Sequence, residues 1–357
     1  MLNIAIAGAG GMAAYHYKGF VAAGATVVAV CDVNIKNAER FATQYGIKRV
    51  MTFEEALADT SIDAISIITP NKFHHPMTVA ALDAGKNVYC EKPPALNAHE
   101  MLDMLSAARK NDKLLMFDFN NRARPESQAI KSYIDAGEVG RINSAQAFWI
   151  RRAGIPGFGG WFTQKNLSGG GPLIDLPHML DLALYFMGYP EPAQLLGVTY
   201  NDFINDSAFK GPWGLADVAG VVNDVEAAAH AMITFRTGQS LMMRCSWAEL
   251  NERELVSVTF QGTKAGGKVE RLFGIDGIDS TSQDSCMLFT QQHGRQVNLN
   301  VTVQPDESMG RIENAANFAR VLMNGEEPYN KPEQALILMR IIDALYKSAS
   351  TGKAVEF

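Results

Sequence analysis

Residues 1–121 alternate short apolar runs with segments of helical periodicity. The apolar runs predict strands at Leu2–Ala7, Thr26–Cys31, Ile62–Thr69, Asn87–Cys90 and Leu114–Phe119. Helical patterns lie between these runs, and Gly46 and Gly85 follow two of them, where a glycine commonly ends a helix. The runs are continuous rather than alternating, which indicates strands buried on both faces of a parallel sheet. This strand–helix alternation predicts a doubly wound α/β domain.

From residue 122 onward a few helices are followed by many short, closely spaced strands. Helices are predicted over Pro125–Ala136 and within Leu173–Met187, whereas residues 201–223 have the Gly, Pro, Asn and Asp content of a loop. The predicted strands are Ile142–Ile150, Glu226–Phe235, Gln239–Trp247, Leu255–Gln261, Lys268–Phe273, Cys286–Gln291 and Gln296–Val303. Their alternation indicates a large, mostly antiparallel sheet with one exposed or helix-covered face.

Two domains are therefore expected, over residues 1–121 and 122–357. Their number agrees with the length of 357 residues, at about 150 residues per domain. A last amphipathic helix is predicted over residues 332–348, with Pro332 in its first turn. Its apolar face is expected to pack within the second domain or back onto the first.

The composition is that of an ordinary globular protein, with 47% hydrophobic and 20% charged residues. The net charge of −6 disfavours nucleic acid and anionic membranes as partners. No apolar run reaches the about 18 residues of a membrane span. The four cysteines form no CxxC pair, which argues against a zinc knuckle or a disulfide framework. A cytoplasmic location is the resulting expectation.

The first strand ends in a glycine-rich turn, Gly8-Ala9-Gly10-Gly11-Met12-Ala13. This is the G-x-G-x-x-A pattern, in which Gly8 permits a tight turn and Gly10 lets the backbone approach a pyrophosphate. The amide groups at the start of the following helix favour the anion. Asp32, at the end of the second strand, is placed to bind ribose hydroxyls. Its charge would repel a 2′-phosphate, so NAD is favoured over NADP.

Further motifs follow along the chain. They are Thr69-Pro70-Asn71, His74, Glu91-Lys92-Pro93, Asn120–Arg122, Arg151-Arg152 and Gly169–Asp175 with His178 and Asp181. In this order they resemble the glucose–fructose oxidoreductase / inositol dehydrogenase / rhizopine-catabolism (Gfo/Idh/MocA) family over essentially the whole chain. The resemblance implies a Rossmann domain followed by an α+β domain whose open sheet mediates a dimer or tetramer. It also implies NAD(P)-dependent redox chemistry on sugars, polyols or related compounds.

The resemblance also implies the residues of the site. Cofactor contacts are expected from Gly8, Gly10, Gly11, Met12, Asp32, Thr69, Pro70, Asn71, His74, Glu91, Lys92 and Asn120. Substrate contacts are expected from Lys92, Arg122, Arg152, Trp161, Asp175 and His178. No metal is expected, because the adjacent His74 and His75 point apart on a helix and lack a neighbouring carboxylate cluster.

The chemistry of alcohol oxidation explains the three catalytic candidates, Lys92, His178 and Asp175. The cofactor accepts the hydride, so the protein must orient the alcohol and remove its proton. Histidine is a suitable base, which assigns that role to His178. An ammonium group beside the developing alkoxide lowers the barrier, which is the role expected of Lys92. Glu91 could hold that lysine, and Pro93 permits a cis bond after it.

Asp175 has more than one possible role. The family commonly spaces its aspartate and histidine as D-x-x-x-H, whereas Asp175 and His178 are separated by two residues only. Asp175 is then either a partner of His178 or an N-cap, and Asp181 is a competing partner.

Arg151 and Arg152 alternate across a strand, and the resemblance favours Arg152 for the cleft. Trp161 is either a lid over the substrate or a loop anchor.

The leading functional hypothesis is an oxidoreductase that transfers a hydride between NAD and a secondary alcohol of a sugar, cyclitol or sugar derivative. An alternative is a glycosidase that recycles NAD through transient oxidation and elimination. A third is a non-catalytic NAD or sugar sensor, against which the presence of Lys92 and His178 argues.

Overall fold

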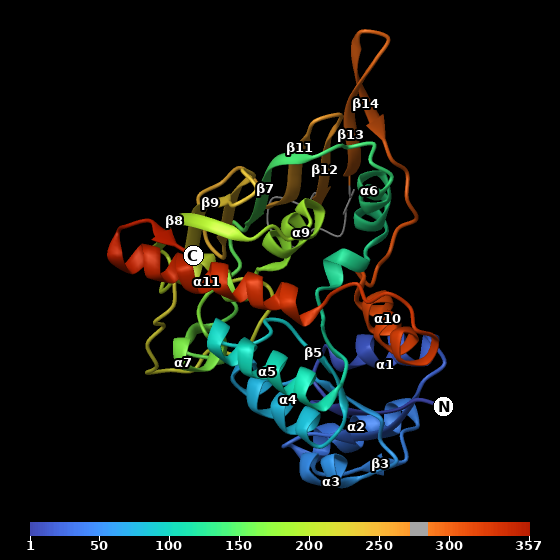
Figure 1. The fold of residues 1–357 in the computed structure, drawn as a ribbon. Coiled ribbons are helices and arrows are strands. Elements are labelled where there is room, and N and C mark those ends of the chain that lie inside the picture. Colours follow the sequence, from blue (N-terminus) through green and yellow to red (C-terminus); the bar gives the residue numbers. More distant parts are fainter. Residues whose placement is uncertain (272–284) are drawn as a thin grey trace. The chain divides into compact units, whose positions relative to one another are not determined.

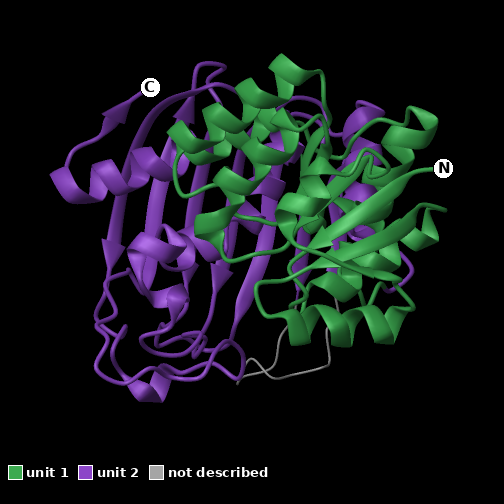
Figure 2. Cartoon of the chain, turned by 90° about the horizontal axis from the view of Figure 1, so that it is seen from below, with its two compact units in different colours: residues 1–123, 306–339 green, residues 124–305, 340–357 purple. Residues whose placement is uncertain are grey.

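A computed structural model describes residues 1–271 and 285–357, and these form two compact units (Figures 1 and 2). Unit 1 comprises residues 1–123 and 306–339, and unit 2 comprises residues 124–305 and 340–357. The chain thus returns to unit 1 after building most of unit 2. No helix within the described ranges combines the length and hydrophobicity that crossing a membrane would require.

Unit 1 contains a six-stranded sheet in which every neighbouring pair is parallel. Its strands are β1 (Asn3–Ala7), β2 (Thr26–Cys31), β3 (Arg49–Val50), β4 (Ala64–Ile67), β5 (Asn87–Cys90) and β6 (Leu115–Phe117). The order β3-β2-β1-β4-β5-β6 is that of a Rossmann sheet and confirms the predicted fold class. The direction of winding reverses beside β1, and ligands of such sheets bind at the carboxyl ends of the strands at this point.

The helices of unit 1 follow the strands as predicted, with two additions. They are α1 (Ala13–Ala22), α2 (Ile35–Tyr45), α3 (Phe53–Ala58), α4 (His74–Asp83), α5 (Ala98–Asn111) and α10 (Arg311–Asn324), with 3-10 turns η1 (Asn71–Phe73) and η2 (Asn120–Ala123). The sequence patterns predicted neither α3 nor α10. Helix α10 packs closely on α1, because a Cβ atom at Gly19 would collide with the Ile312 carbonyl and lie 2.6 Å from the Cβ of Ala315. Phe20 and Phe318 meet in the core behind this contact.

Unit 2 contains a nine-stranded sheet in the order β14-β13-β12-β11-β7-β10-β9-β8-β15. The strands are β7 (Ile142–Ile150), β8 (Pro192–Tyr200), β9 (Ala228–Phe235), β10 (Ser240–Ser246), β11 (Leu255–Gly262), β12 (Gly266–Arg271), β13 (Ser285–Gln292), β14 (Arg295–Asn300) and β15 (Val355–Glu356). Only β7 and β10 pair in parallel, so the sheet is mostly antiparallel, as predicted. The end of the expected strand Lys268–Phe273, at residues 272 and 273, lies outside the described residues.

Helices cover one face of the unit 2 sheet. They are α6 (Pro125–Asp135), α7 (Lys165–Ser168), α8 (Pro172–Asp175), α9 (His178–Met187) and residues 340–351 of α11 (Pro332–Thr351), with 3-10 turns η3 (Trp161–Thr163) and η4 (Ser207–Phe209). Helix α9 lies against β7 and β11, and α8 lies against β9 and β10. The opposite face exposes apolar side chains, including Leu196, Met232 and Met242.

Candidate active site

The turn between β1 and α1 has the shape of a phosphate-binding loop. Gly8 has a φ of +105°, and a Cβ atom there would collide with the carbonyl oxygen of Ile68. Among the described residues, no atom lies within 4 Å of a Cβ added at Gly10 or Gly11, so this side of the turn is open. Met12 makes no side-chain capping bond to α1, which leaves the first turn of the helix accessible to an anion.

Asp32 lies directly beside this turn. Its Oδ2 accepts a hydrogen bond from the Ala9 N–H, and its Oδ1 accepts one from the Asn34 N–H, both at 2.8 Å. These two bonds orient the carboxylate next to the glycine turn. This is where a Rossmann domain places the acid that binds the ribose of a dinucleotide.

His74 joins the two loops that follow β4 and β5. One ring nitrogen lies 2.8 Å from the carbonyl oxygen of Thr69, and the other lies 2.7 Å from that of Pro93. Burial lowers the pKa of His74, although the two carbonyl contacts oppose that shift. His74 begins α4 and has only 1% of its surface exposed. It therefore holds the two loops together from a buried position.

Lys92 lies at the carboxyl end of β5, on the same edge of the sheet as Gly8 and Asp32. Its side chain is partly exposed, and its backbone N–H donates to Glu91 Oε2 at 3.1 Å. The Lys92–Pro93 bond is cis. The structure therefore brings the glycine turn, Asp32, Asn71 and Lys92 to one edge of unit 1.

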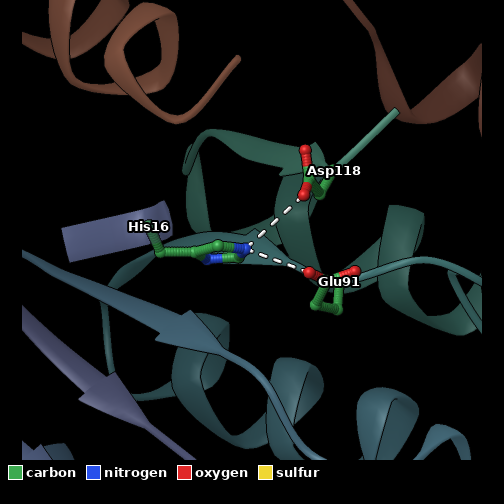
Figure 3. Close-up of side chains that lie close together, drawn as sticks. All are labelled: His16, Glu91 and Asp118. Atoms are coloured by element: carbon green, nitrogen blue, oxygen red, sulfur yellow. Dashed lines mark hydrogen bonds and ion pairs between the residues drawn. The ribbon is translucent and has the colours of Figure 1, made fainter. Parts of the chain in front are cut away.

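A buried ionic cluster lies next to this edge and was missed in the sequence (Figure 3). His16 Nε2 lies 3.1 Å from Glu91 Oε1 and 3.6 Å from Asp118 Oδ2. These atoms are also spaced closely enough to be ligands of one metal ion. Only the occurrence of an ionisable residue in the otherwise apolar interior face of α1 could have drawn attention to His16.

Arg122 and Asn120 are bonded within unit 1. The Arg122 guanidinium donates to the Tyr329 carbonyl at 2.9 Å and to Gln334 Oε1 at 2.6 Å, and the residue has no exposed surface. Asn120 Nδ2 donates to the Met309 carbonyl at 2.6 Å. These bonds tie η2 to the returning segment of unit 1, and they lend no support to the expected contact of Arg122 with substrate.

His178, the first residue of α9, lies in an aromatic and cationic cluster of unit 2. Its ring packs against Trp149 with 5.2 Å between the ring centroids. The Arg151 guanidinium lies 5.7 Å from the Trp149 ring and 5.0 Å from the Trp213 ring. Arg151, rather than Arg152, thus joins the cluster of His178, and Trp149 and Trp213 are residues that the sequence analysis missed.

The segment between Asp175 and His178 is not one helix. Asp175 ends α8, Leu176 departs from helical geometry, and Pro177 precedes α9 as its N-cap residue. Asp175 is therefore not the N-cap of α9, and its Oδ2 accepts a hydrogen bond from Trp247 Nε1 at 3.0 Å. Asp181 is buried and accepts a hydrogen bond from the Tyr189 hydroxyl, which directs its carboxylate toward that side chain.

Glu226 holds the glycine-rich segment that precedes α8. Its Oε1 accepts hydrogen bonds from the backbone of Gly171 and Leu173 and from the Tyr346 hydroxyl, at 3.0–3.1 Å. A Cβ atom at Gly170 would collide with that hydroxyl, and one at Gly171 would collide with the Glu226 carbonyl. Close packing around a buried acid thus explains why this segment consists of glycines.

Arg152 and Trp161 lie elsewhere in unit 2. Arg152 lines a groove of about 620 Å³ with Phe209 and Glu249, and its guanidinium donates to the Glu252 carbonyl at 3.4 Å. Trp161 stacks on Phe162 with 3.8 Å between centroids, and Phe162 meets Trp213 edge to face. An aromatic series therefore connects Trp161 to the Arg151 cluster.

Comparison with known proteins identifies the two units. The family model described as "Oxidoreductase family, NAD-binding Rossmann fold" matches residues 2–119, and that described as "Oxidoreductase family, C-terminal alpha/beta domain" matches residues 131–357. D-glucoside 3-dehydrogenase of Escherichia coli (strain K12) is 32% identical over 99% of this chain and 97% of its own length. scyllo-Inositol 2-dehydrogenase (NAD(+)) of Bacillus subtilis (strain 168) is 30% identical over 63% of this chain and 67% of its own length.

A solved structure supports the fold. Levoglucosan dehydrogenase in complex with NADH and levoglucosan has a TM-score of 0.85 at 21% identity, covering 99% of both chains. The chain thus shares this fold, and residues 2–119 and 131–357 match the two family models in order. The protein belongs to the Gfo/Idh/MocA family of oxidoreductases, with an NAD-binding Rossmann domain as its first part.

Proposed function

We propose that this protein is an NAD-dependent dehydrogenase that oxidises a secondary alcohol of a sugar or cyclitol. The observation that carries the proposal is the end-to-end similarity to D-glucoside 3-dehydrogenase, at 32% identity over 99% of the chain. The open glycine turn and the oriented Asp32 carboxylate fit a dinucleotide, because they offer amide groups to its phosphates and an acceptor to its ribose.

The residues of the chain divide the proton chemistry between them. Bound NAD supplies the hydride acceptor for the alcohol carbon. His178 takes the hydroxyl proton, and its ring is held by the face of Trp149. Lys92 stabilises the negative charge that develops on the substrate oxygen. Asp175 is oriented by Trp247 and binds a neighbouring substrate hydroxyl.

The assignment can be tested with a panel of inositols, aldoses and alkyl glucosides, with NAD as oxidant. NADH formation in proportion to oxidised product, followed by the absorbance of the reduced nicotinamide, is the expected result. Turnover with only trace NAD and no net NADH would instead support the NAD-recycling glycosidase. Binding of NAD and sugar without any conversion would contradict an enzymatic role and support a sensor.

Asp32 is expected to set the preference for NAD over NADP. Its carboxylate is fixed beside the glycine turn by two backbone N–H groups, so it cannot swing away from a 2′-phosphate. Replacing it by serine (Asp32→Ser) removes the like-charge repulsion, which is commonly several kcal/mol. The ratio of kcat/KM for NAD to that for NADP should then fall about 100-fold, or about 2.7 kcal/mol.

Asp63→Asn is a matched control for this change. Asp63 also accepts a hydrogen bond from a backbone N–H, that of Asn3, but lies at the amino end of the unit 1 strands. This variant should leave the cofactor ratio unchanged. An Asp32→Ser enzyme that retained the wild-type ratio would show that another residue discriminates between the cofactors.

We also propose that the open face of the unit 2 sheet forms a homo-oligomer. Leu196, Met232 and Met242 are paired across β8, β9 and β10 in one row, and each is exposed by at least 41%. Such an apolar row on a sheet surface indicates an interaction site. Light scattering after gel filtration should show a dimer or tetramer, and Met232→Glu should dissociate it.

Leu250→Glu provides the control for this prediction. Leu250 is 84% exposed, but it lies outside the strands of the sheet, so its substitution should not change the mass in solution. A wild-type monomer at micromolar concentration would contradict the proposed assembly.

A further inference from the structure

The ionic cluster of His16, Glu91 and Asp118 is bonded directly to the backbone of Lys92. His16 Nε2 contacts Glu91 Oε1 at 3.1 Å, and the second oxygen of that carboxylate, Oε2, accepts the Lys92 N–H at 3.1 Å. All three side chains are buried, and His16 has no exposed surface (Figure 3). A short series of contacts therefore connects α1 to the residue that is proposed to act on the substrate oxygen.

The other polar atoms of the cluster are bonded to unit 1. His16 Nδ1 lies 2.8 Å from the Ser66 hydroxyl on β4. Asp118 Oδ1 accepts hydrogen bonds from the Tyr89 hydroxyl on β5 and from Asn314 Nδ2 on α10, both at 2.9 Å. Three elements of unit 1 thus fix the cluster in position, which is the property required of a support for a catalytic side chain.

The charge of the cluster depends on His16. Burial by itself lowers the pKa of His16, but hydrogen bonds and charges from Asp118 and Glu91 outweigh it and raise the pKa to about 9. The imidazole is consequently protonated at neutral pH, so both ring nitrogens donate. Tyr89, Cys90 and His74 also interact with the carboxylates of the cluster. Burial raises the pKa of Tyr89 and of Cys90 and lowers the pKa of His74, so all three stay neutral.

We propose that His16 is a positioning residue for Lys92. Its imidazolium holds the Glu91 carboxylate in the orientation that receives the Lys92 N–H, and this bond sets the backbone from which the ammonium reaches the substrate. This inference rests on the proposed function in one respect, that Lys92 acts on the substrate oxygen. It adds that His16, on α1, positions Lys92 for that role.

A metal ion is the competing occupant of this cluster. The ligand atoms of the three residues lie within 4.8 Å of one another, as a bound ion would require. A protonated His16 accounts for the same geometry without a metal ion, because its ring then donates to Ser66 and to Glu91. The Asp118 carboxylate already accepts hydrogen bonds from Tyr89 and Asn314. Elemental analysis showing one equivalent of metal in the purified protein would overturn the proposal.

A double-mutant cycle tests whether His16 acts through Glu91. His16→Gln and Glu91→Ala should each lower kcat about 10- to 100-fold, the effect of misplacing a catalytic group by about 1 Å. The Kd of NADH should change little in His16→Gln, because His16 is fully buried. The kcat of the double variant should lie within about twofold of that of Glu91→Ala, because both changes break the same series of contacts. If the double variant instead lost kcat by the product of the two single losses, the proposal would be overturned.

Tyr89→Phe separates positioning from stability. It removes a hydroxyl that donates to Asp118 Oδ1, whereas His16 contacts the other oxygen of that carboxylate, Oδ2. Its melting temperature should fall while kcat stays within about twofold of the wild type. A loss of kcat equal to that of His16→Gln would show that the cluster acts through folding alone and would overturn the proposal.

Two measurements do not depend on turnover. In ¹⁵N-histidine NMR, the His16 ring should be protonated at pH 7 and titrate near pH 9. A neutral ring at pH 7 would overturn the proposal.

Trace acetylation compares the reactivity of Lys92 with that of Lys72. The ratio should change several-fold in His16→Gln and in Glu91→Ala, and not in Tyr89→Phe. If the wild type oxidises no sugar, the proposed function fails while this labelling still decides the role of His16.

Discussion

Replacement of His178 by asparagine is expected to lower kcat by a factor of about 10²–10⁴, the contribution that general acid–base catalysis typically makes. Asparagine keeps a polar group at the start of α9 but cannot take a proton from the alcohol. The fold should survive the loss of the ring contact with Trp149. Initial rates at saturating NAD and sugar give the change in kcat.

His99→Asn is the matched control for the His178 variant. The His99 side chain is 84% exposed on α5, and its substitution should leave kcat unchanged. Added imidazole should restore part of the activity of His178→Asn, because a free base can replace the missing one. A His178→Asn enzyme with more than about a third of wild-type kcat would exclude this histidine as the base.

Replacement of Lys92 by methionine is expected to lower kcat about 10²–10³-fold, the loss seen when one group that stabilises an oxyanion is removed. Methionine preserves most of the length of the side chain and removes its charge. The Glu91–Lys92 backbone bond and the His74–Pro93 contact do not involve the ammonium group, so the loop should keep its structure. A larger kinetic isotope effect with a substrate deuterated at the reacting carbon would show that hydride transfer has become slower.

Lys72→Met tests whether any positive charge near the loops would suffice. Lys72 is exposed in η1, two residues before His74, and its substitution should change kcat less than about twofold. If Lys92→Met instead left kcat normal and raised KM, Lys92 would bind the substrate equally in the ground state and the transition state and would not assist the reaction.

Much of unit 1 could be predicted because its signals are local. Five of its strands are continuous apolar runs, and the turn at Gly8 needs a residue that tolerates positive φ. Strand β3 has two residues and was missed because so short a segment has no periodicity. Helix α10 was missed because its buried residues mix Asn314 and Asn317 with small residues such as Ala315, which are recognisable as core only once α1 lies against them.

In the candidate site, too, features with a local signal could be predicted and features that depend on distant residues could not. The sequence pattern placed Asp32 and Lys92 at strand ends, and the parallel sheet brings strand ends to one edge. That Arg151 lies over the rings of Trp149 and Trp213 could not be read from the sequence, because Trp213 is far away along the chain. Arg122 was expected at the substrate, but its partners at residues 329 and 334 lie more than 200 positions later.

Local patterns were enough to predict the alternation of strands and helices, the glycine turn with its acid, and the family, because each depends on neighbouring residues or on motifs in a given order. The tertiary structure alone decided that His16 meets Glu91 and Asp118, that Glu226 caps the segment before α8, and that α10 returns to unit 1. These contacts join residues 50 or more positions apart, and burial makes their charges and hydrogen bonds strong.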